Sequence, residues 1–282
     1  MARETSNESN GSLLVLPSYS KVYLDRLSSL EGRFKRLLES SGSSPSNKQV
    51  HDLRVTIRRI RSATLFIKSD PGKRSLKELD HRLKKKLKVL GNRRELDVAM
   101  DDAHAWHLDD RRLGKLRKKA RAQVNRSFAR HRRKKLLRVL TETLREVERN
   151  PNPRFSDTLE ELRGTLLPWL DVPILRKKDI HSFRIVMKKS RYTLEMLGSS
   201  VGPLDRLQDC LGRSHDIEVL SKLTEICPSL RKLEDREIHN ARKLAGPSLH
   251  FLLGEIELHA RRLASFNSKR HRRGESACLP SQ

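Results

Sequence analysis

The sequence predicts an all-α fold in which helices pack together as bundles, and three observations support this prediction. Nearly every long segment carries apolar residues three or four positions apart, which is the repeat of one helix face. No segment shows the alternation of apolar and polar residues that is typical of a strand. A histidine–arginine pattern in the first half of the chain recurs in the second half. The 282 residues are enough to bury a hydrophobic core.

The first half of the chain is predicted to form a series of helices separated by turn residues. Ser46 and Gln49 have the spacing of a capping box, so a helix should begin just after Ser46. Asp70-Pro71-Gly72 is a strong turn signal, and Gly91 is placed to end a lysine-rich helix. Residues 109–149 form either one long helix or two. The other predicted helices cover residues 19–40 (with a stop at Gly42), about 47–68, 73–90 and 93–107.

The run Asn150-Pro151-Asn152-Pro153 is the clearest interruption in the chain. It divides the helical region, residues 19–266, into two repeats of about 19–150 and 154–266. Residues 1–18 and the basic tail, residues 267–282, are expected to be flexible. The helices predicted for the second half cover residues near 157–170, 179–198, 203–211, 214–226, 229–244 and 247–266.

The charge balance of the chain points to an anionic partner. The chain has 61 lysines and arginines against 35 aspartates and glutamates, a formal net charge of +26. Such an excess repels itself in the folded state, and it requires counterions or a polyanion. Nucleic acid, polyphosphate, an anionic membrane surface and an acidic protein are the candidate partners. Aromatic residues are only 4% of the chain, which disfavours binding of single-stranded nucleic acid by base stacking.

Three further features of the sequence bear on where the protein resides. The three cysteines have no metal-ligand spacing, and an odd number fits a reducing compartment. No run of 18 apolar residues is present, so no membrane insertion is expected. The polar start, Met1 to Gly11, does not have the pattern of a signal peptide. The sequence therefore predicts a cytoplasmic protein.

The repeated pattern is His-x-apolar-Arg-apolar-x-apolar-basic-basic-x-Arg. It runs from His51 to Arg61 and again from His181 to Arg191. Each copy is followed by a Leu-Gly pair with an acid four residues after the glycine. These downstream pairs are Leu90-Gly91 with Glu95, to which Asp97 adds a second acid, and Leu211-Gly212 with Asp216. We expect the acids to orient arginines or to cap helices, and the glycines to form backbone turns.

Helical spacing places the cations of each copy on one stripe beside an apolar stripe. The apolar stripe, once buried, would hold the basic stripe at the edge of the core, with the charged heads directed into a groove. Like charges on one helix face repel, and a bound polyanion would relieve this repulsion. Guanidinium groups match phosphate oxygens, and histidine adds a charge that depends on pH. The two basic stripes are His51, Arg54, Arg58 and Arg61, and His181, Arg184, Lys188 and Arg191.

These motifs, together with Arg94-Glu95-Leu96-Asp97-Val98 and Leu207-Gln208, resemble the CHAD family, the conserved histidine α-helical domain. The resemblance covers roughly residues 19–266. It implies two pseudo-symmetric helical bundles around a basic groove or pore that binds inorganic polyphosphate, and association with polyphosphate granules. The ligands that the resemblance implies are His51, Arg54, Arg58, Arg59, Arg61, His181, Arg184, Lys188, Lys189 and Arg191, with Lys84, Lys85 and Lys88 in second rank.

The chain departs from the family pattern at two positions. Glu95 stands where an aspartate is usual, and His215 precedes Asp216 where a small polar residue is common. Members often follow a triphosphate-tunnel catalytic domain, for which this chain has no room, so a stand-alone member is expected.

Other interpretations of these residues stay open. The basic stripes could be solvated surface, and His51 and His181 could cap helix starts. His51-Asp52 has the form of a metal phosphohydrolase motif, but the second copy reads His181-Ser182. An aspartate and histidine cluster could hold a metal ion or be an exposed acidic patch. The cluster comprises Asp101, Asp102, His104, His107, Asp109 and Asp110.

We therefore expect a polyphosphate-binding protein with no catalytic residue, metal or cofactor. The alternatives are a non-specific nucleic-acid-binding protein and a metal-dependent phosphohydrolase. Neither has a recognisable motif set in the chain.

Overall fold

The computed structural model describes residues 19–42, 44–67, 74–149, 153–172, 176–224 and 228–272. Within these residues every regular element is a helix and there is no strand, so the all-α prediction is confirmed. No helix in this part of the chain is both long enough and apolar enough to span a membrane. The predicted turn Asp70-Pro71-Gly72, residues 150–152 of the predicted interruption, and the terminal residues 1–18 and 273–282 lie outside the described residues.

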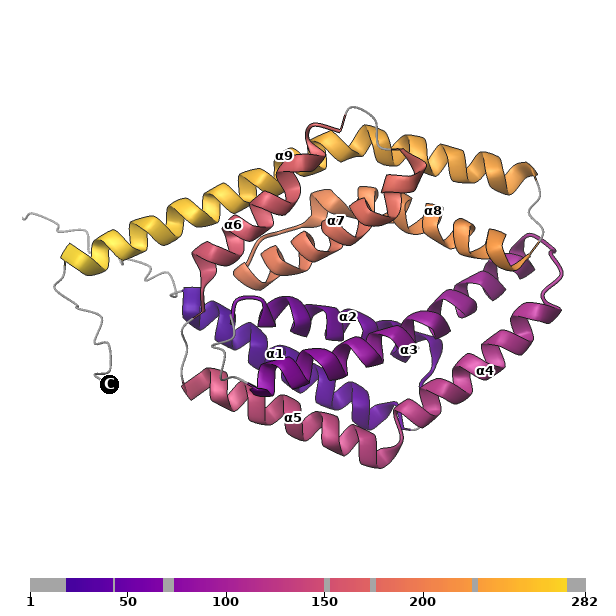
Figure 1. Ribbon diagram of the computed structural model, residues 1–282, viewed down its shortest axis with the longest axis horizontal. Coiled ribbons are helices and arrows are strands. Elements are labelled where there is room, and N and C mark those ends of the chain that lie inside the picture. The colour runs from indigo at the N-terminus through magenta and orange to yellow at the C-terminus, as the bar shows by residue number, and fades with distance from the viewer. Residues whose placement is uncertain are drawn as a thin grey trace, which may run out of the picture.

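Figure 1 shows the helices of the first half on one side of the molecule and those of the second half on the other. The helices of the first half are α1 (Tyr19–Ser40), α2 (Asn47–Thr64), α3 (Arg74–Ala105), α4 (Arg111–Ser127) and α5 (Arg130–Arg149). Those of the second half are α6 (Phe155–Leu166), α7 (Lys177–Leu197), α8 (Asp205–Leu223) and α9 (Pro228–Arg272), with short 3-10 helices at Leu167–Trp169 and Gly202–Leu204. The two halves meet where α2 packs against α7 and α3 against α8.

The start of α2 follows the predicted capping box. The Ser46 hydroxyl accepts a hydrogen bond from the Gln49 amide at 3.2 Å, and the Ser46 amide donates to the Gln49 side chain at 2.8 Å. Both contacts satisfy amide groups that the first turn leaves without a helical partner. The helix ends at Thr64, four residues before the predicted end. The predicted stop after α1 is also present, because Gly42 has a φ of 54°.

The segment 109–149, for which the sequence left two possibilities, forms two helices. The first, α4, ends at Ser127, and α5 begins at Arg130. Between them the Phe128 side chain is fully buried in the core, which fixes the position of the break. The break therefore depends on where Phe128 packs rather than on a proline or glycine.

Three predicted helix ends were wrong. Gly91 and Gly212 lie inside α3 and α8, and Pro247 lies inside α9, so each pair of predicted helices is one helix. Glycine costs about 1 kcal/mol and proline about 3 kcal/mol inside a helix, but packing can offset these costs. Leu90 and Leu211, next to the two glycines, are fully buried, and so is Leu252 shortly after Pro247. Gly198, with a φ of 102°, does end α7.

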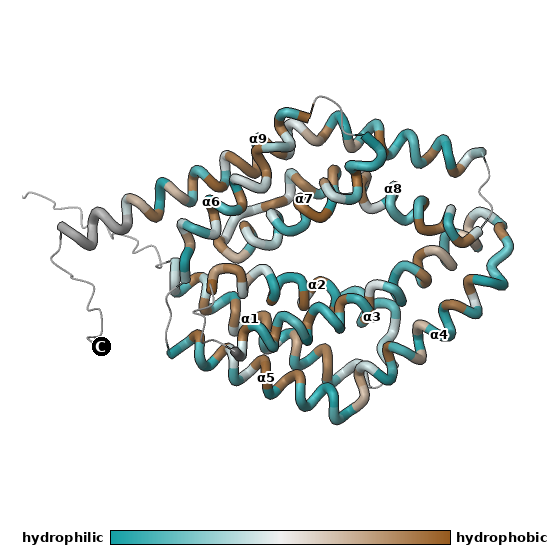
Figure 2. The backbone as a smooth tube through the Cα atoms, in the orientation of Figure 1, coloured by the Kyte–Doolittle hydropathy of each residue, from teal (hydrophilic) through white to brown (hydrophobic). Residues whose placement is uncertain are grey.

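Burial of the apolar stripes positions the two repeated helices. Figure 2 shows apolar and polar residues alternating along the helices, as expected for amphipathic helices. The apolar stripe of α2 (Val50, Leu53, Ile57 and Ile60) and that of α7 (Ile180, Phe183, Met187 and Leu194) belong to one buried cluster. A second cluster packs the end of α3 against α4, α8 and the start of α9. The basic stripes of α2 and α7 lie next to these buried residues, with Arg54, Arg58, Arg184 and Lys188 partly buried and His51 and His181 exposed.

Candidate anion-binding site

The cations of α2 and α7 line one pocket of about 440 Å³ between the two helices. From α2 it takes Arg54, Arg58, Arg61 and Ser62, followed by Leu65 at the helix end. From α7 it takes His181, Arg184, Ile185, Lys188, Lys189 and Tyr192, and the remaining lining residues are Glu95 of α3 and His215 of α8. The two basic rows therefore face a common space, although they lie in different halves of the chain.

Five lysines and arginines of the lining have no ion pair among the described residues: Arg54, Arg58, Arg184, Lys188 and Lys189. Lys189 is exposed, and the other four side chains are partly buried. The Nε atoms of Arg54 and Arg184 are fully buried and lack a hydrogen-bond partner within the described part of the chain. A buried polar atom without a partner costs about 1–3 kcal/mol, more if it is charged. The pocket therefore holds positive charge that the protein itself does not neutralise.

The pKa values of these cations reflect the same excess of positive charge. Burial, together with Arg58, lowers the pKa of Arg54 to about 10. Burial also lowers the pKa of Arg184. For Lys188, burial and the nearby Arg184, Arg58 and Arg54 lower the pKa to about 7. An anion in the pocket would counter each of these effects, because it would favour the charged forms.

Two acids lie near the cations. The nearby His215 is the main cause of a lowered pKa at Glu95, and its ring nitrogen Nε2 lies 3.9 Å from Glu95 Oε1. Burial raises the pKa of Asp216, while Arg184 lowers it by a smaller amount. The charge of Glu95 is thus shared with His215, which leaves Arg54 and Arg184 without close carboxylate partners.

Two of the predicted ligands that lie outside the pocket lining share one carboxylate partner. Glu195 on α7 accepts hydrogen bonds from Arg59 at 2.8 Å and from Arg191 at 3.0 Å. Arg191 also lies 2.8 Å from Asp205, and its Nη1 donates to Gln208 at 3.0 Å. These contacts join α2, α7 and the start of α8, so Arg59 and Arg191 hold the pocket walls together.

The other predicted ligands do not all lie in this pocket. Arg61 lines the pocket, but its Nε lies 2.7 Å from Asp80, which also pairs with Lys84 at 2.7 Å. His51 is exposed and does not line the pocket. Burial and then Arg94 lower its pKa. Lys85 and Lys88 line a different pocket, between α3, α4 and α5.

Sequence reasoning did not place His215 in the site, although it noted this residue as a departure from the family pattern. His215 lines the pocket, and its ring centroid lies 5.7 Å from that of His181. Its position next to Asp216, after Leu211-Gly212, is the signal that could have identified it. In the first half, Asp97 does not line the pocket. It is buried between Arg93 and Arg117, 2.7 Å from each.

The aspartate and histidine cluster at 101–110 is engaged in contacts within the protein. Asp102 lies 2.8 Å from Arg213, and Asp109 lies 3.1 Å from Arg111. His104 contacts Asp110. Among the described residues, no group of three or more histidine, cysteine or acidic side chains is arranged to hold a metal ion.

The fold and the site define a strongly basic, all-helical protein with a cation-lined pocket between its halves. A family model of the CHAD domain matches residues 28–225, and the chain belongs to this family. The structure of the CHAD domain from the plant Ricinus communis is similar, with a TM-score of 0.57, 20% identity, and coverage of 90% of this chain and 91% of that chain. PptA from Streptomyces chartreusis is also similar, with a TM-score of 0.55, 13% identity, and coverage of 85% of this chain and 99% of that chain. No curated protein matches the chain.

Proposed function

We propose that this protein binds inorganic polyphosphate in the pocket between α2 and α7, and that it acts by binding rather than by catalysis. One observation carries the proposal: Arg54, Arg58, Arg184 and Lys188 converge on this pocket, and none has an ion pair among the described residues. Partly buried cations that repel one another are costly in the free protein. A polyanion would convert that cost into favourable binding free energy.

The side chains of the pocket suit phosphate oxygens. Two like charges about 5 Å apart repel by roughly 3 kcal/mol at an effective dielectric constant of 20. A chain of phosphates placed between α2 and α7 would replace this repulsion with charge-assisted hydrogen bonds. Arg54 and Arg184 line the pocket and have no ion pair among the described residues, so their guanidinium groups supply donors for such bonds. Lys188 would contribute a point charge beside these planar groups.

The lining favours polyphosphate over nucleic acid. Binding of single strands commonly uses aromatic side chains on which bases stack. Among the described residues no tryptophan or phenylalanine lines this pocket, and Tyr192, which does, is buried. Polyphosphate carries no base or sugar, so it needs only cations and hydrogen-bond donors. The pocket has several of both.

A binding role also accounts for the acids near the pocket. Hydrolysis of a phosphate chain requires a nucleophile or a metal-held water. We assign Glu95 and Asp216 to the support of His215 and Arg184 instead, because these are the charged neighbours of the two carboxylates. Incubation with polyphosphate and divalent metal ions tests this assignment, since release of phosphate would indicate an enzyme.

We further propose a cytoplasmic location at polyphosphate granules, which a fluorescent fusion would test.

The decisive experiment is a calorimetric titration with polyphosphates of defined length, with DNA and RNA as competitors. The variant Arg54→Ala/Arg184→Ala should weaken binding at least about tenfold with little change in helicity. A matched control is Arg206→Ala/Arg231→Ala, which removes two exposed arginines outside the pocket. If the first variant binds long polyphosphate as the parent does at moderate salt, the site is wrong. If nucleic acid displaces polyphosphate at equal phosphate concentration, the ligand is wrong.

A further inference from the structure

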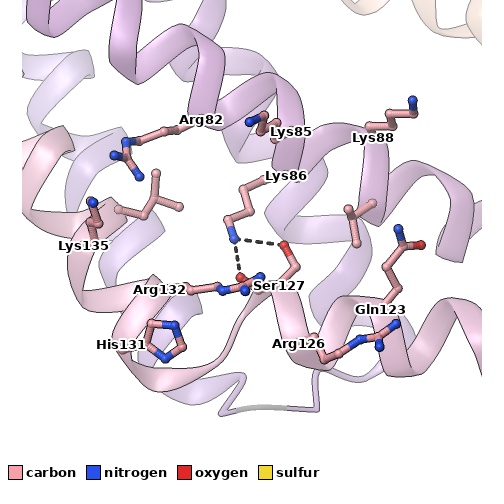
Figure 3. A pocket seen from close by; sticks show the side chains of 12 residues that line it. Arg82, Lys85, Lys86, Lys88, Gln123, Arg126, Ser127, His131, Arg132 and Lys135 are labelled. Atoms are coloured by element: carbon pink, nitrogen blue, oxygen red, sulfur yellow. Dashed lines mark hydrogen bonds between the residues drawn. The ribbon is translucent and has the colours of Figure 1, made fainter.

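A second cation-lined pocket lies on the first half of the molecule, between α3, the end of α4 and the start of α5. Its volume is about 680 Å³. Figure 3 shows the side chains of Arg82, Lys85, Lys88, Arg126, Arg132 and Lys135 around it. Lys86 and His131 also line it, and within the part of the chain that the structure describes no aspartate or glutamate does. It shares no lining residue with the pocket between α2 and α7.

Most of the charge in this second pocket is available to a ligand. Of its lysines and arginines, Arg82 alone forms an ion pair among the described residues, with Glu78 of the same helix. Lys85, Lys88, Arg126, Arg132 and Lys135 are all exposed. Exposed cations on a convex surface are commonly solvated, but here they surround a concave space. Such a concave cluster concentrates the positive potential.

Lys86 holds the wall of this pocket in place. Its ammonium donates to the Ser127 hydroxyl at 2.9 Å and to the Ser127 carbonyl at the end of α4, as Figure 3 shows. It also lies 4.8 Å from the centroid of the Phe128 ring. The break between α4 and α5 is thereby fixed against α3. The first turn of α5, with His131 and Arg132, is directed at the pocket, where the positive end of the helix dipole adds to the side-chain charge.

A third pocket joins the two basic ones. It has a volume of about 770 Å³ and lies over the middle of α3. It shares Glu95, His181 and His215 with the pocket between α2 and α7. It shares Gln123 and Arg126 with the pocket between α3, α4 and α5. The three pockets therefore adjoin one another in a row, which we call the track, beside the part of α3 from Arg82 to Glu95, roughly 20 Å long at 1.5 Å per helical residue.

We propose that the pocket between α3, α4 and α5 is a second anion-binding site, which holds phosphate groups of the same polyphosphate chain that occupies the pocket between α2 and α7. This inference rests on the proposed function. A chain long enough to follow the track engages both sites at once, and the second contact is then intramolecular. Affinity therefore rises steeply once the ligand spans the face of α3. Short phosphates bind the two sites independently.

The test uses two triple variants of the full chain that each remove three exposed lysines. Lys85→Gln/Lys88→Gln/Lys135→Gln acts on the second pocket. Lys77→Gln/Lys118→Gln/Lys134→Gln is the control, with one substitution on each of α3, α4 and α5, and these lysines line none of the three pockets. The pocket variant should bind long-chain polyphosphate at least about tenfold more weakly than the control variant. Tripolyphosphate binds the two sites independently, so the pocket variant should still bind it between α2 and α7. This variant should lose only the second, weaker binding event.

The outcomes separate this inference from the proposed function. If both triple variants bind long chains equally, the second site is wrong, whereas the proposed function is judged by Arg54→Ala/Arg184→Ala. If that double variant has no effect but the pocket triple weakens binding, the second site stands and the first is wrong. If single-stranded DNA binds the parent as tightly as polyphosphate and loses affinity equally in the pocket triple, polyphosphate is the wrong ligand for this site.

Discussion

Glu195 on α7 accepts a hydrogen bond from Arg59 on α2 at 2.8 Å, and this contact ties together the two helices that form the pocket. The second oxygen of the same carboxylate accepts from Arg191 at 3.0 Å. The side chain of Glu195 is only 14% exposed, so removal of its charge would leave the partly buried Arg59 without a carboxylate partner and take one of two partners from Arg191. Removing one partner of a buried ion pair is costly, because the other charge stays buried without its counter-charge.

The first prediction concerns this contact. Glu195→Ala should lower the free energy of unfolding by about 1–3 kcal/mol, because it leaves Arg59 without its carboxylate partner and Arg191 with Asp205 alone. Urea denaturation followed by circular dichroism measures the change. Glu257→Ala is the control, since it removes an exposed carboxylate that pairs with Arg261 one turn along α9. The control should change stability by less than about 0.5 kcal/mol. Equal effects of the two substitutions would contradict the role given to Glu195.

The second prediction is a pH dependence of polyphosphate binding. The pKa of Lys188 is about 7 in the free protein, and a bound polyanion should raise it. Binding above pH 7 therefore takes up a proton, so affinity should fall as the pH rises from about 6.5 to about 9, by up to tenfold per unit. Calorimetry in buffers of different ionisation enthalpy counts the protons.

Lys188→Arg separates this effect from the titration of other groups at the site. Arginine stays charged throughout this range, so the variant should show a flatter pH profile above pH 7. His181, His215 and the terminal phosphates of the ligand are the same in both proteins. An unchanged profile in the variant would show that Lys188 does not take up the proton.

The sequence predicted the elements whose signals are local or periodic. The capping box at Ser46 and Gln49 marked the start of α2, and the spacing of apolar residues such as Leu53 and Phe183 predicted the buried faces. The predicted ends at Gly91 and Pro247 were wrong because local propensity costs only about 1–3 kcal/mol, which burial of neighbouring leucines offsets.

Long-range pairing explains what sequence reasoning could not predict at the site. The family resemblance placed Arg58 and Arg59 together in one list of ligands. Only the arrangement of α2 and α7 shows that Glu195, in the other half of the chain, pairs with Arg59 and not with Arg58. The second basic pocket likewise depends on the break between α4 and α5, which the sequence left open.

The third prediction concerns the buried acid that follows the first Leu-Gly pair. Asp97 is fully buried and lies 2.7 Å from both Arg93 and Arg117, while Arg93 also donates to Asn47 at 2.9 Å. Asp97→Asn should cost about 3–5 kcal/mol of unfolding free energy, because it leaves a buried arginine without a counter-charge. Asp101→Asn, at an exposed position on the same helix, is the control. Thermal and urea unfolding of both variants measure the difference, and a loss below 1 kcal/mol at Asp97 would contradict this role.

The last prediction contrasts two neighbouring arginines on α2. Arg58 lines the pocket and has no ion pair among the described residues, whereas Arg59 is paired with Glu195 outside the lining. Arg58→Ala should weaken polyphosphate binding and reduce the slope of log affinity against log salt by roughly one, because one fewer cation displaces counterions from the ligand. Its stability should be equal to or higher than that of the parent, since repulsion with Arg54, Arg184 and Lys188 is relieved.

Arg59→Ala should have the opposite signature. It should lower the free energy of unfolding by about 1–2 kcal/mol and leave the salt slope unchanged, because its partner is a carboxylate of the protein and not the ligand. Titrations at several salt concentrations, combined with urea unfolding, measure both quantities for both variants. The two substitutions remove the same side chain at adjacent positions, so they change the net charge equally. If the salt slopes of the two variants fall by the same amount, net charge rather than the geometry of the pocket determines binding.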